Sequence, residues 1–239
     1  MRPPRMRVAL FGRSLAGFTL ANAMERAGHE VQMLSDPAEL ASFEALIIAV
    51  GDARLEATVE LLEPHVHRGL IVFHTCLSRG VQVLDPLETR GCVVAALAPF
   101  ALMRWAVTTL DELGETVVEL NITEFRGEAV ALSDAERPSF AARAYYAEML
   151  RRLHISAAVD ARFFPSAEEK PMVGEDMDTE EIIAAYRGAT DPGLRRSYVE
   201  VARRLGEVDG REELEMWALQ EESLSLIHIS EPTRQEAIS

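Results

Sequence analysis

The segment Arg7-Val-Ala-Leu-Phe-Gly-Arg-Ser-Leu-Ala-Gly17 joins a short apolar run to two closely spaced glycines. An amphipathic helical pattern follows over residues 18–27 and stops at Gly28. A second strand pattern, Glu30-Val-Gln-Met-Leu34, begins directly afterwards. Strand, tight turn, helix and strand within about thirty residues are typical of a βαβ unit.

The glycine spacing in this turn is close to G-x-G-x-x-G, the pattern of dinucleotide-binding βαβ units. Here it reads Gly12-Arg-Ser-Leu-Ala-Gly17, so Ser14 replaces the glycine that lets the backbone approach a pyrophosphate. A helix N-terminus holds such an anion with unpaired N–H groups and a partial positive charge, and the serine hydroxyl can bond a phosphate oxygen. We therefore predict a dinucleotide site here. The alternative is a Rossmann-type fold whose turn binds nothing.

Strand-like and helix-like runs alternate along the first half of the chain. Apolar runs typical of buried parallel strands occupy residues 45–50, 70–74 and 92–97, and Pro99 closes the last of them. This alternation predicts an α/β fold, a Rossmann-like doubly wound parallel sheet with helices on both faces. Right-handed crossovers place the C-terminal ends of the strands at one edge, where ligands bind.

We predict that this edge and the glycine turn form the cofactor site. The residue at the end of the second strand indicates which cofactor binds. Asp36 lies there, roughly twenty residues past the turn, and an acidic group at this place favours NAD because it can accept hydrogen bonds from the ribose hydroxyls. Arg13 instead favours NADP, because arginine can pair with its 2′-phosphate. Asp36 could equally cap a turn before Pro37. The cofactor is therefore NAD or NADP. The predicted binding residues are Gly12, Arg13, Ser14, Leu15, Gly17, Ser35, Asp36, Val50, Gly51, Asp52 and Thr75.

Candidate catalytic groups follow the fourth strand. His74 could act as an acid or base, and Cys76 could be a nucleophile if its pKa were lowered. The alternatives are that His74 caps a strand and that Cys76 is a small buried hydrophobe. No metal-ligand spacing is present, because His65 and His67 are two residues apart on a helix end and do not share a face.

Two further strands and several helices are predicted after residue 100. Strand patterns occupy residues 105–109 and 128–132, with a helix beginning at Asp111 between them. Its expected apolar face carries Leu113, Val117, Val118 and Ile122.

The pattern is helical from Ala135 onward, with apolar residues at helical spacing at positions 140, 144, 147 and 150. Further helices are expected over residues 179–187 and from Asp191 to about Leu205. We therefore place a domain boundary near Asp134. Residues 1–134 form the predicted dinucleotide-binding Rossmann-like domain, and residues 135–223 form a helical domain for substrate binding or dimerisation.

The segment Leu224-Ser-Leu-Ile-His-Ile-Ser-Glu-Pro-Thr-Arg234 matches the in-frame translation of a transposase adapter used in sequencing libraries. We interpret residues 224–239 as a sequencing-adapter artefact and exclude them from the fold prediction, because such a segment was not selected to fold with the rest of the chain. His228 is accordingly not a catalytic candidate. The alternative is a genuine amphipathic tail.

Composition narrows the class of protein. The chain has 239 residues, of which 48% are hydrophobic, and a net charge of −15, which disfavours nucleic-acid binding. No apolar run approaches the about eighteen residues of a membrane span, and no secretory signal pattern follows the basic N-terminus. Two cysteines make no disulfide framework. We expect a cytoplasmic protein without a membrane or nucleic-acid partner.

From Arg7 to about Leu205 the chain resembles a family of poorly characterised bacterial Rossmann-like proteins, and more distantly ketopantoate reductase, pyrroline-5-carboxylate reductase and the 6-phosphogluconate dehydrogenase group. The stretches that carry the resemblance are the glycine turn with Ala27-Gly-His-Glu-Val31, Leu46-Ile-Ile-Ala-Val-Gly-Asp52, Val72-Phe-His-Thr75, Gly80-Val-Gln-Val-Leu-Asp-Pro86, Ala98-Pro99 and Thr190-Asp-Pro-Gly-Leu-Arg-Arg-Ser-Tyr198. The resemblance implies an NAD(P)-binding domain, a helical C-terminal domain and a homodimer.

This chain departs from the family at two polar positions. Family members commonly carry His-Pro where this chain has Ala98-Pro99, and Tyr-His where it has Phe140-Ala141. Lys170 lies in an expected loop over residues 164–171 and does not align with the lysine of the hydroxyacid dehydrogenase relatives. Hydride transfer needs a nearby proton donor or acceptor. Three hypotheses follow: an NAD(P)-dependent oxidoreductase acting on a small molecule, a non-catalytic dinucleotide sensor, and a structural module with a dead nucleotide site.

Overall fold

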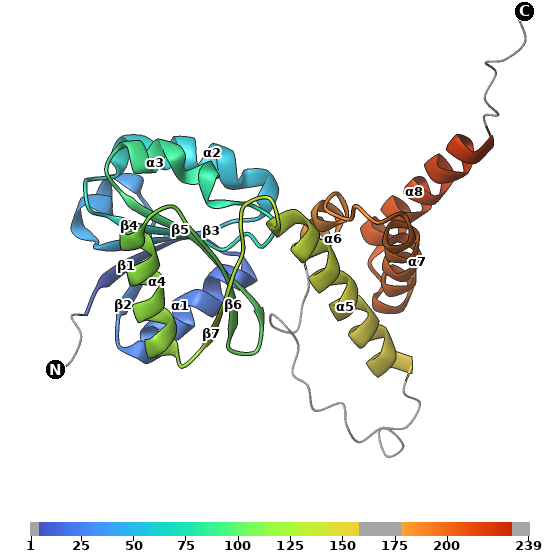
Figure 1. Ribbon diagram of the computed structural model, residues 1–239, viewed down its shortest axis with the longest axis horizontal. Coiled ribbons are helices and arrows are strands. Elements are labelled where there is room, and N and C mark those ends of the chain that lie inside the picture. The colour runs from blue at the N-terminus through green and yellow to red at the C-terminus, as the bar shows by residue number, and fades with distance from the viewer. Residues whose placement is uncertain (1–4, 158–177, 231–239) are drawn as a thin grey trace, which may run out of the picture. The chain divides into compact units, whose positions relative to one another are not determined.

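The computed structural model describes residues 5–157 and 178–230, with side chains to residue 153 and from 178 to 224 (Figure 1). The expected loop over residues 164–171, with Lys170, lies outside them, as do residues 231–239 of the segment that matches the adapter. The described residues divide into two compact units, unit 1 over residues 5–141 and unit 2 over residues 142–157 and 178–230. The division falls within one long helix.

Unit 1 is built on a seven-stranded sheet in the order β2-β1-β3-β4-β5-β6-β7. Neighbouring strands from β2 to β5 are parallel. Because β2 lies on one side of β1 and β3 on the other, the strand order reverses between β1 and β3. The prediction of a Rossmann-like doubly wound sheet is confirmed. The strands are β1 (Arg7–Gly12), β2 (Glu30–Met33), β3 (Ala45–Ala49), β4 (Ile71–His74), β5 (Val93–Ala101), β6 (Arg104–Thr109) and β7 (Glu128–Ala131).

The sheet is not parallel throughout, which corrects the sequence prediction. β6 runs antiparallel to β5, and β7 is parallel to β6. The cause is the short turn between β5 and β6, because a connection of this length joins only antiparallel strands. Met103 in this turn has φ 58°, a left-handed conformation.

Pro99 does not close β5, contrary to the prediction. It lies within the strand and pairs with Trp105, and the register with β6 shifts between Pro99 and Ala101. Bulges of this kind tolerate proline. The pairing of β5 with β4 has already ended at Ala96, so one side of the strand has no ladder for the proline to interrupt.

Helices cover both faces of the sheet in unit 1. The elements are α1 (Leu15–Ala27), α2 (Asp52–Leu62), α3 (Asp85–Thr89) and α4 (Glu112–Phe125), with 3₁₀ turns η1 (Pro37–Ser42), η2 (Glu63–His65) and η3 (Val81–Leu84). Side chains of α1 and α4 share one core with Phe73, whereas those of α2 and α3 share another with Val72. Adjacent residues of β4 thus enter opposite layers, as the alternation of a strand requires.

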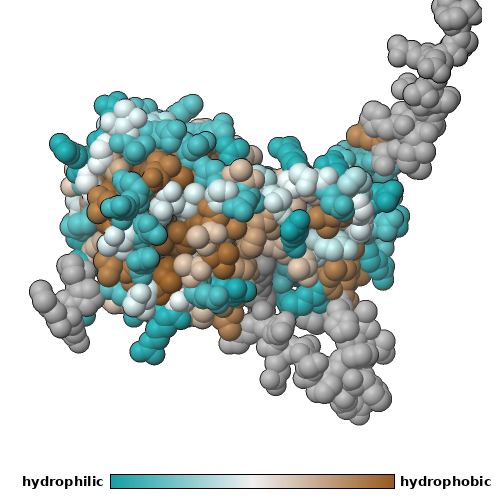
Figure 2. Space-filling model, in the orientation of Figure 1, coloured by the Kyte–Doolittle hydropathy of each residue, from teal (hydrophilic) through white to brown (hydrophobic). Residues whose placement is uncertain are grey.

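Helix α4 differs from its predicted apolar face at one position. Asp111 caps the helix as predicted, and Val118 and Ile122 are buried. Leu113, however, is 56% exposed, and Leu120 is 62% exposed. Figure 2 shows apolar side chains among polar ones on this face of unit 1, in the region of α4.

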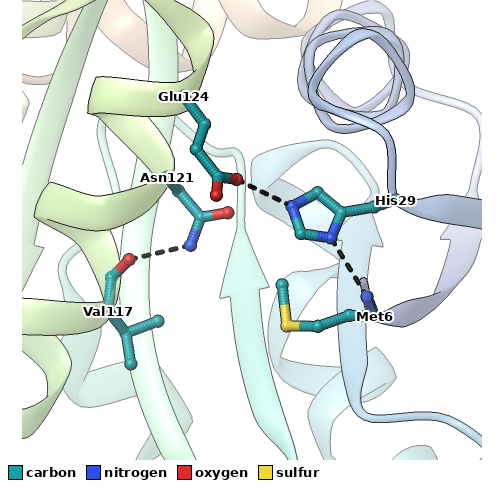
Figure 3. A network of polar contacts seen from close by, with 5 residues as sticks. All are labelled: Met6, His29, Val117, Asn121 and Glu124. Atoms are coloured by element: carbon teal, nitrogen blue, oxygen red, sulfur yellow. Dashed lines mark hydrogen bonds and ion pairs between the residues drawn. The ribbon is translucent and has the colours of Figure 1, made fainter. Parts of the chain in front are cut away.

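A polar network joins the residues that follow α1 and precede β1 to α4, at the N-terminal ends of the strands (Figure 3). The Met6 main-chain N–H donates to His29 Nδ1 at 3.2 Å, so the proton of the neutral ring sits on Nε2 and faces Glu124 at 3.0 Å. Asn121 donates to the main-chain oxygen of Val117 at 2.8 Å. This network lies at the end of the sheet opposite the predicted site.

Unit 2 is helical and contains most of α5 (Arg137–Ala157) with α6 (Thr179–Tyr186), α7 (Pro192–Asp209) and α8 (Glu212–Ser230). Asp191 caps α7 through the Leu194 N–H, as the Asp-Pro-Gly sequence predicts. The backbones of α7 and α8 approach closely at Gly206, where an added Cβ would lie 2.8 Å from the Glu215 nitrogen. Tyr186 packs against both Tyr198 and Trp217, and the three rings form an aromatic cluster.

The buried face of α5 was predicted incorrectly. Ala141, Tyr145 and Met149 are buried, whereas Ala147 and Leu150 are exposed. Both sets have helical spacing, so periodicity alone does not choose between them.

Within the described residues, no helix has the length and apolar character needed to cross a membrane.

Candidate dinucleotide-binding site

The turn between β1 and α1 packs directly against the end of β3. Gly12 has φ 101°, and a Cβ there would lie 2.1 Å from the main-chain oxygen of Ala49. A Cβ on Gly17 would lie 2.1 Å from the Ala49 side chain. Both glycines are therefore required, the first for the tight turn and the second for close packing of helix on strand.

Ser14 caps α1. Its Oγ accepts a hydrogen bond from the Gly17 N–H at 3.1 Å, and its own N–H donates to Ala49 O at 2.9 Å. In the part of the chain that the structure describes, the N–H groups of Leu15 and Ala16 have no acceptor. Free amides at a helix N-terminus form an anion site, so the turn suits a pyrophosphate.

The strand ends bring several predicted residues to this edge. Thr75 Oγ1 lies 3.5 Å from Ser14 Oγ, which connects the end of β4 to the start of α1. Ser78 donates to the Asp52 carboxylate at the start of α2. A Cβ on Gly51 would meet no atom within 4 Å, so the space beside the end of β3 is open.

Asp36 and Ser35 follow β2, next to β1 in the sheet, and both are exposed. The Asp36 carboxylate caps η1, because its Oδ1 accepts from the Ala38 N–H at 2.9 Å. This contact favours the interpretation of Asp36 as a cap. Arg13 lies exposed in the turn.

His74 and Cys76 are both buried. His74 is fully inaccessible, and its Nε2 faces Gly80 O at 3.0 Å. Burial, together with the charge of Arg137, lowers the pKa of His74 to about 3, so the ring is neutral at neutral pH. Cys76 Sγ donates to Val50 O at 3.2 Å. These positions favour structural roles for both side chains.

Sequence reasoning missed Arg137, which bonds to the loop that follows β4. Its side chain is fully buried although it belongs to the first turn of α5. It donates to main-chain oxygens of the loop after β4, including those of Cys76 and Arg79. No sequence pattern predicts that this arginine is buried, because these two acceptors are main-chain carbonyl groups about sixty positions away. Among the residues that the structure describes, no group of three or more His, Cys, Asp and Glu side chains is arranged to hold a metal ion.

Two family models match parts of the chain. Residues 33–99 match the family model of a Rossmann-like domain, and residues 133–221 match that of a 6-phosphogluconate dehydrogenase C-terminal domain-like region. The resemblance to Rossmann-like and 6-phosphogluconate dehydrogenase-type domains is thereby confirmed. No curated protein matches the chain significantly.

Three solved structures illustrate the shared fold. Pyrroline carboxylate reductase from Plasmodium falciparum with NADP bound has a TM-score of 0.52 at 10% identity, covering 93% of this chain and 92% of that one. Arogenate dehydrogenase from Synechocystis has 0.50 at 13%, with 93% and 90% covered. Prephenate dehydrogenase from A. aeolicus, solved with hydroxyphenyl propionate and NAD+, has 0.50 at 13%, with 94% and 89% covered.

Fold and matches together define the class: a two-domain protein in which a Rossmann-like domain is followed by a helical domain like that of 6-phosphogluconate dehydrogenase. Its N-terminal domain has the dinucleotide-binding type of architecture, with a glycine turn beside the point where the strand order reverses.

Proposed function

We propose that this protein binds a nicotinamide dinucleotide at the turn between β1 and α1 and is an oxidoreductase acting on a small molecule. The observation that carries the proposal is the pair of free amides of Leu15 and Ala16, in a turn that Gly12 and Gly17 pack against Ala49. The cofactor would supply hydride. The chain would hold its pyrophosphate at the helix N-terminus, through main-chain N–H groups rather than basic side chains.

Residues 1–134 would then form the dinucleotide-binding domain, and residues 135–223 the domain for substrate binding or dimerisation. Within the first domain we propose NAD in preference to NADP. Asp36 follows β2 with an exposed carboxylate, and only one of its oxygens is used by the Ala38 N–H. A negative group at this place opposes a 2′-phosphate. Replacing Asp36 by Ser should therefore improve NADPH binding relative to NADH.

Fluorescence titration with NADH and NADPH tests the binding site. The sharpest variant is Ser14→Asp, because aspartate is as good an N-cap as serine but places a negative charge beside the proposed pyrophosphate. We expect an unchanged melting temperature and lost binding. Asp111→Ser, the reverse exchange at the cap of α4, is the matched control and should bind normally. Normal binding by Ser14→Asp, or none by the wild type, would contradict the proposal and favour a dead nucleotide site.

A second candidate function, a non-catalytic dinucleotide sensor, is supported by the apolar groups at two departures from the related family. Ala98 and Ala141 are both fully buried, and His74 is neutral and inaccessible. None of these side chains can exchange a proton with a substrate in the observed arrangement. Oxidation of bound NADH across a panel of oxoacids and imines separates the two functions: turnover identifies an enzyme, and binding without turnover a sensor.

We also propose that the protein forms a homodimer through its helical domain. The supporting observation is a pair of exposed apolar side chains on α8, Met216 at 55% and Leu219 at 39% exposure. Sedimentation equilibrium tests the proposal. Met216→Glu with Leu219→Glu should shift the protein toward monomer, and an unchanged mass would place the contact elsewhere.

A further inference from the structure

The loop after β4, Thr75 to Gly80, is held by a single buried guanidinium. Arg137 Nη1 donates to the main-chain oxygens of Cys76, Leu77 and Arg79 at 3.0, 3.3 and 3.1 Å. Its Nη2 donates to Ala96 O and Ala106 O, and its Nε to Thr108 Oγ1. Every guanidinium nitrogen thus bonds to β5, β6 or the loop.

This arrangement is costly for a purely structural residue. Arg137 is fully buried, and in the described chain no carboxylate lies within ion-pair distance of it. Burial lowers the pKa of Arg137 to about 10, so the side chain still carries its charge at neutral pH. A buried charge is expensive, and apolar residues of similar volume often stabilise a fold as well or better. What the guanidinium provides instead is a fixed set of donors that joins the loop to β5 and β6.

Asp134 holds the residues that directly follow this loop, at the start of η3. Its two carboxylate oxygens accept from the N–H groups of Val81 and Gln82 at 2.8 and 3.0 Å. A Cβ on Gly80 would lie 2.1 Å from the Asp134 carboxyl carbon, so only glycine fits beneath this contact. Asp134, just before α5, and Arg137, in the first turn of α5, therefore hold both the amides and the carbonyl groups of the connection from β4 to η3.

The loop carries side chains toward the candidate site. Thr75 at its start lies 3.5 Å from Ser14, and Ser78 donates to Asp52. A dinucleotide lies across the point where the strand order reverses, here between β1 and β3. With the adenosine ribose on the β2 side, the second nucleotide lies on the side of β3 and β4, where this loop is.

We propose that Asp134 and Arg137 are positioning residues that hold the Thr75–Gly80 loop in the geometry that receives the nicotinamide half of the dinucleotide. The proposal rests on the dinucleotide-binding function proposed above. It assigns to these residues no direct contact with the cofactor. Their effect is confined to ligands that extend past the pyrophosphate.

The test compares NADH with ADP, which carries the diphosphate but no nicotinamide half. Arg137→Lys and Asp134→Asn should each weaken NADH binding about tenfold, or about 1.4 kcal/mol, while ADP affinity changes less than about twofold. Arg104→Lys, at an exposed arginine paired with Glu128, is the matched control and should change neither. Circular dichroism checks folding, and the partly exposed Asp134 provides a variant that folds even if Arg137→Lys does not.

Each outcome has a distinct meaning. Equal loss of NADH and ADP affinity would indicate a general structural defect, and unchanged NADH affinity would show that the loop needs no positioning; either result overturns the inference while dinucleotide binding stands. Failure of the wild type to bind NADH and ADP would overturn the proposed function itself, and this inference with it. Amide hydrogen exchange without ligand gives a further readout, because Asp134→Asn should speed exchange at Val81 and Gln82.

Discussion

Gly12 illustrates how one residue joins fold and site. Its left-handed φ and its contact with Ala49 O both exclude a side chain. Gly12→Ala should therefore lower the free energy of unfolding by about 1–3 kcal/mol, in addition to disturbing the turn. Gly51→Ser is the control, because Gly51 has φ −74° with open space around it and serine is a favoured N-cap. Urea unfolding measures both, and equal stability of the two variants would contradict this account of the turn.

His74 leads to a pH prediction. Burial lowers its pKa from 6.5 to about 3 in the folded chain, so below pH 6.5 the unfolded chain binds a proton that the folded chain does not. Stability should fall as pH drops from about 6.5 toward 3, with a slope approaching about 1.4 kcal/mol per pH unit. His74→Gln, which keeps a donor for Gly80 O, should lack this contribution. Urea unfolding of both proteins over this range checks it, and a constant difference between them would refute it.

At the scale of elements, α4 ends at a residue poorly suited to its conformation. Arg126 has φ 57° and caps the helix through hydrogen bonds to Ile122 O and Thr123 O. Glycine adopts this conformation without the side-chain penalty, so Arg126→Gly should stabilise the protein by about 0.5–1 kcal/mol. Arg90→Gly, at the cap of α3 with φ −78°, should instead destabilise it. Thermal unfolding compares them, and stabilisation by both would point to another cause.

At the scale of the whole molecule, the two compact units each contain one tryptophan. Trp105 lies in the core of unit 1, and Trp217 lies in the aromatic cluster of unit 2. If unit 1 binds NAD, a concentration near 100 Kd should stabilise it by about 2.7 kcal/mol. Single-tryptophan variants followed by fluorescence in urea should show a larger NAD-dependent shift for Trp105 than for Trp217. A larger shift for Trp217 would place the binding site in unit 2.

Local patterns carried most of the fold prediction. The apolar run before Gly12, the stop at Gly28 and the cap at Asp111 could be read correctly, because each depends on neighbouring residues in the chain. Gly28 indeed ends α1 with φ 101°. The glycine turn was recognisable for the same reason, since the two glycines and Ser14 lie within one short stretch of chain.

Residues far apart in the chain decided the rest. The direction of β6, the exposure of Leu113 and the buried face of α5 depend on which partner each element meets, and helical spacing fits either choice. The burial of His74 and the hold of Arg137 on the Thr75–Gly80 loop likewise arise only on folding. The sequence by itself determined the βαβ unit and its glycine turn, because backbone conformation and periodicity are local. Only the tertiary structure decided which polar groups are buried, because burial depends on contacts between distant segments.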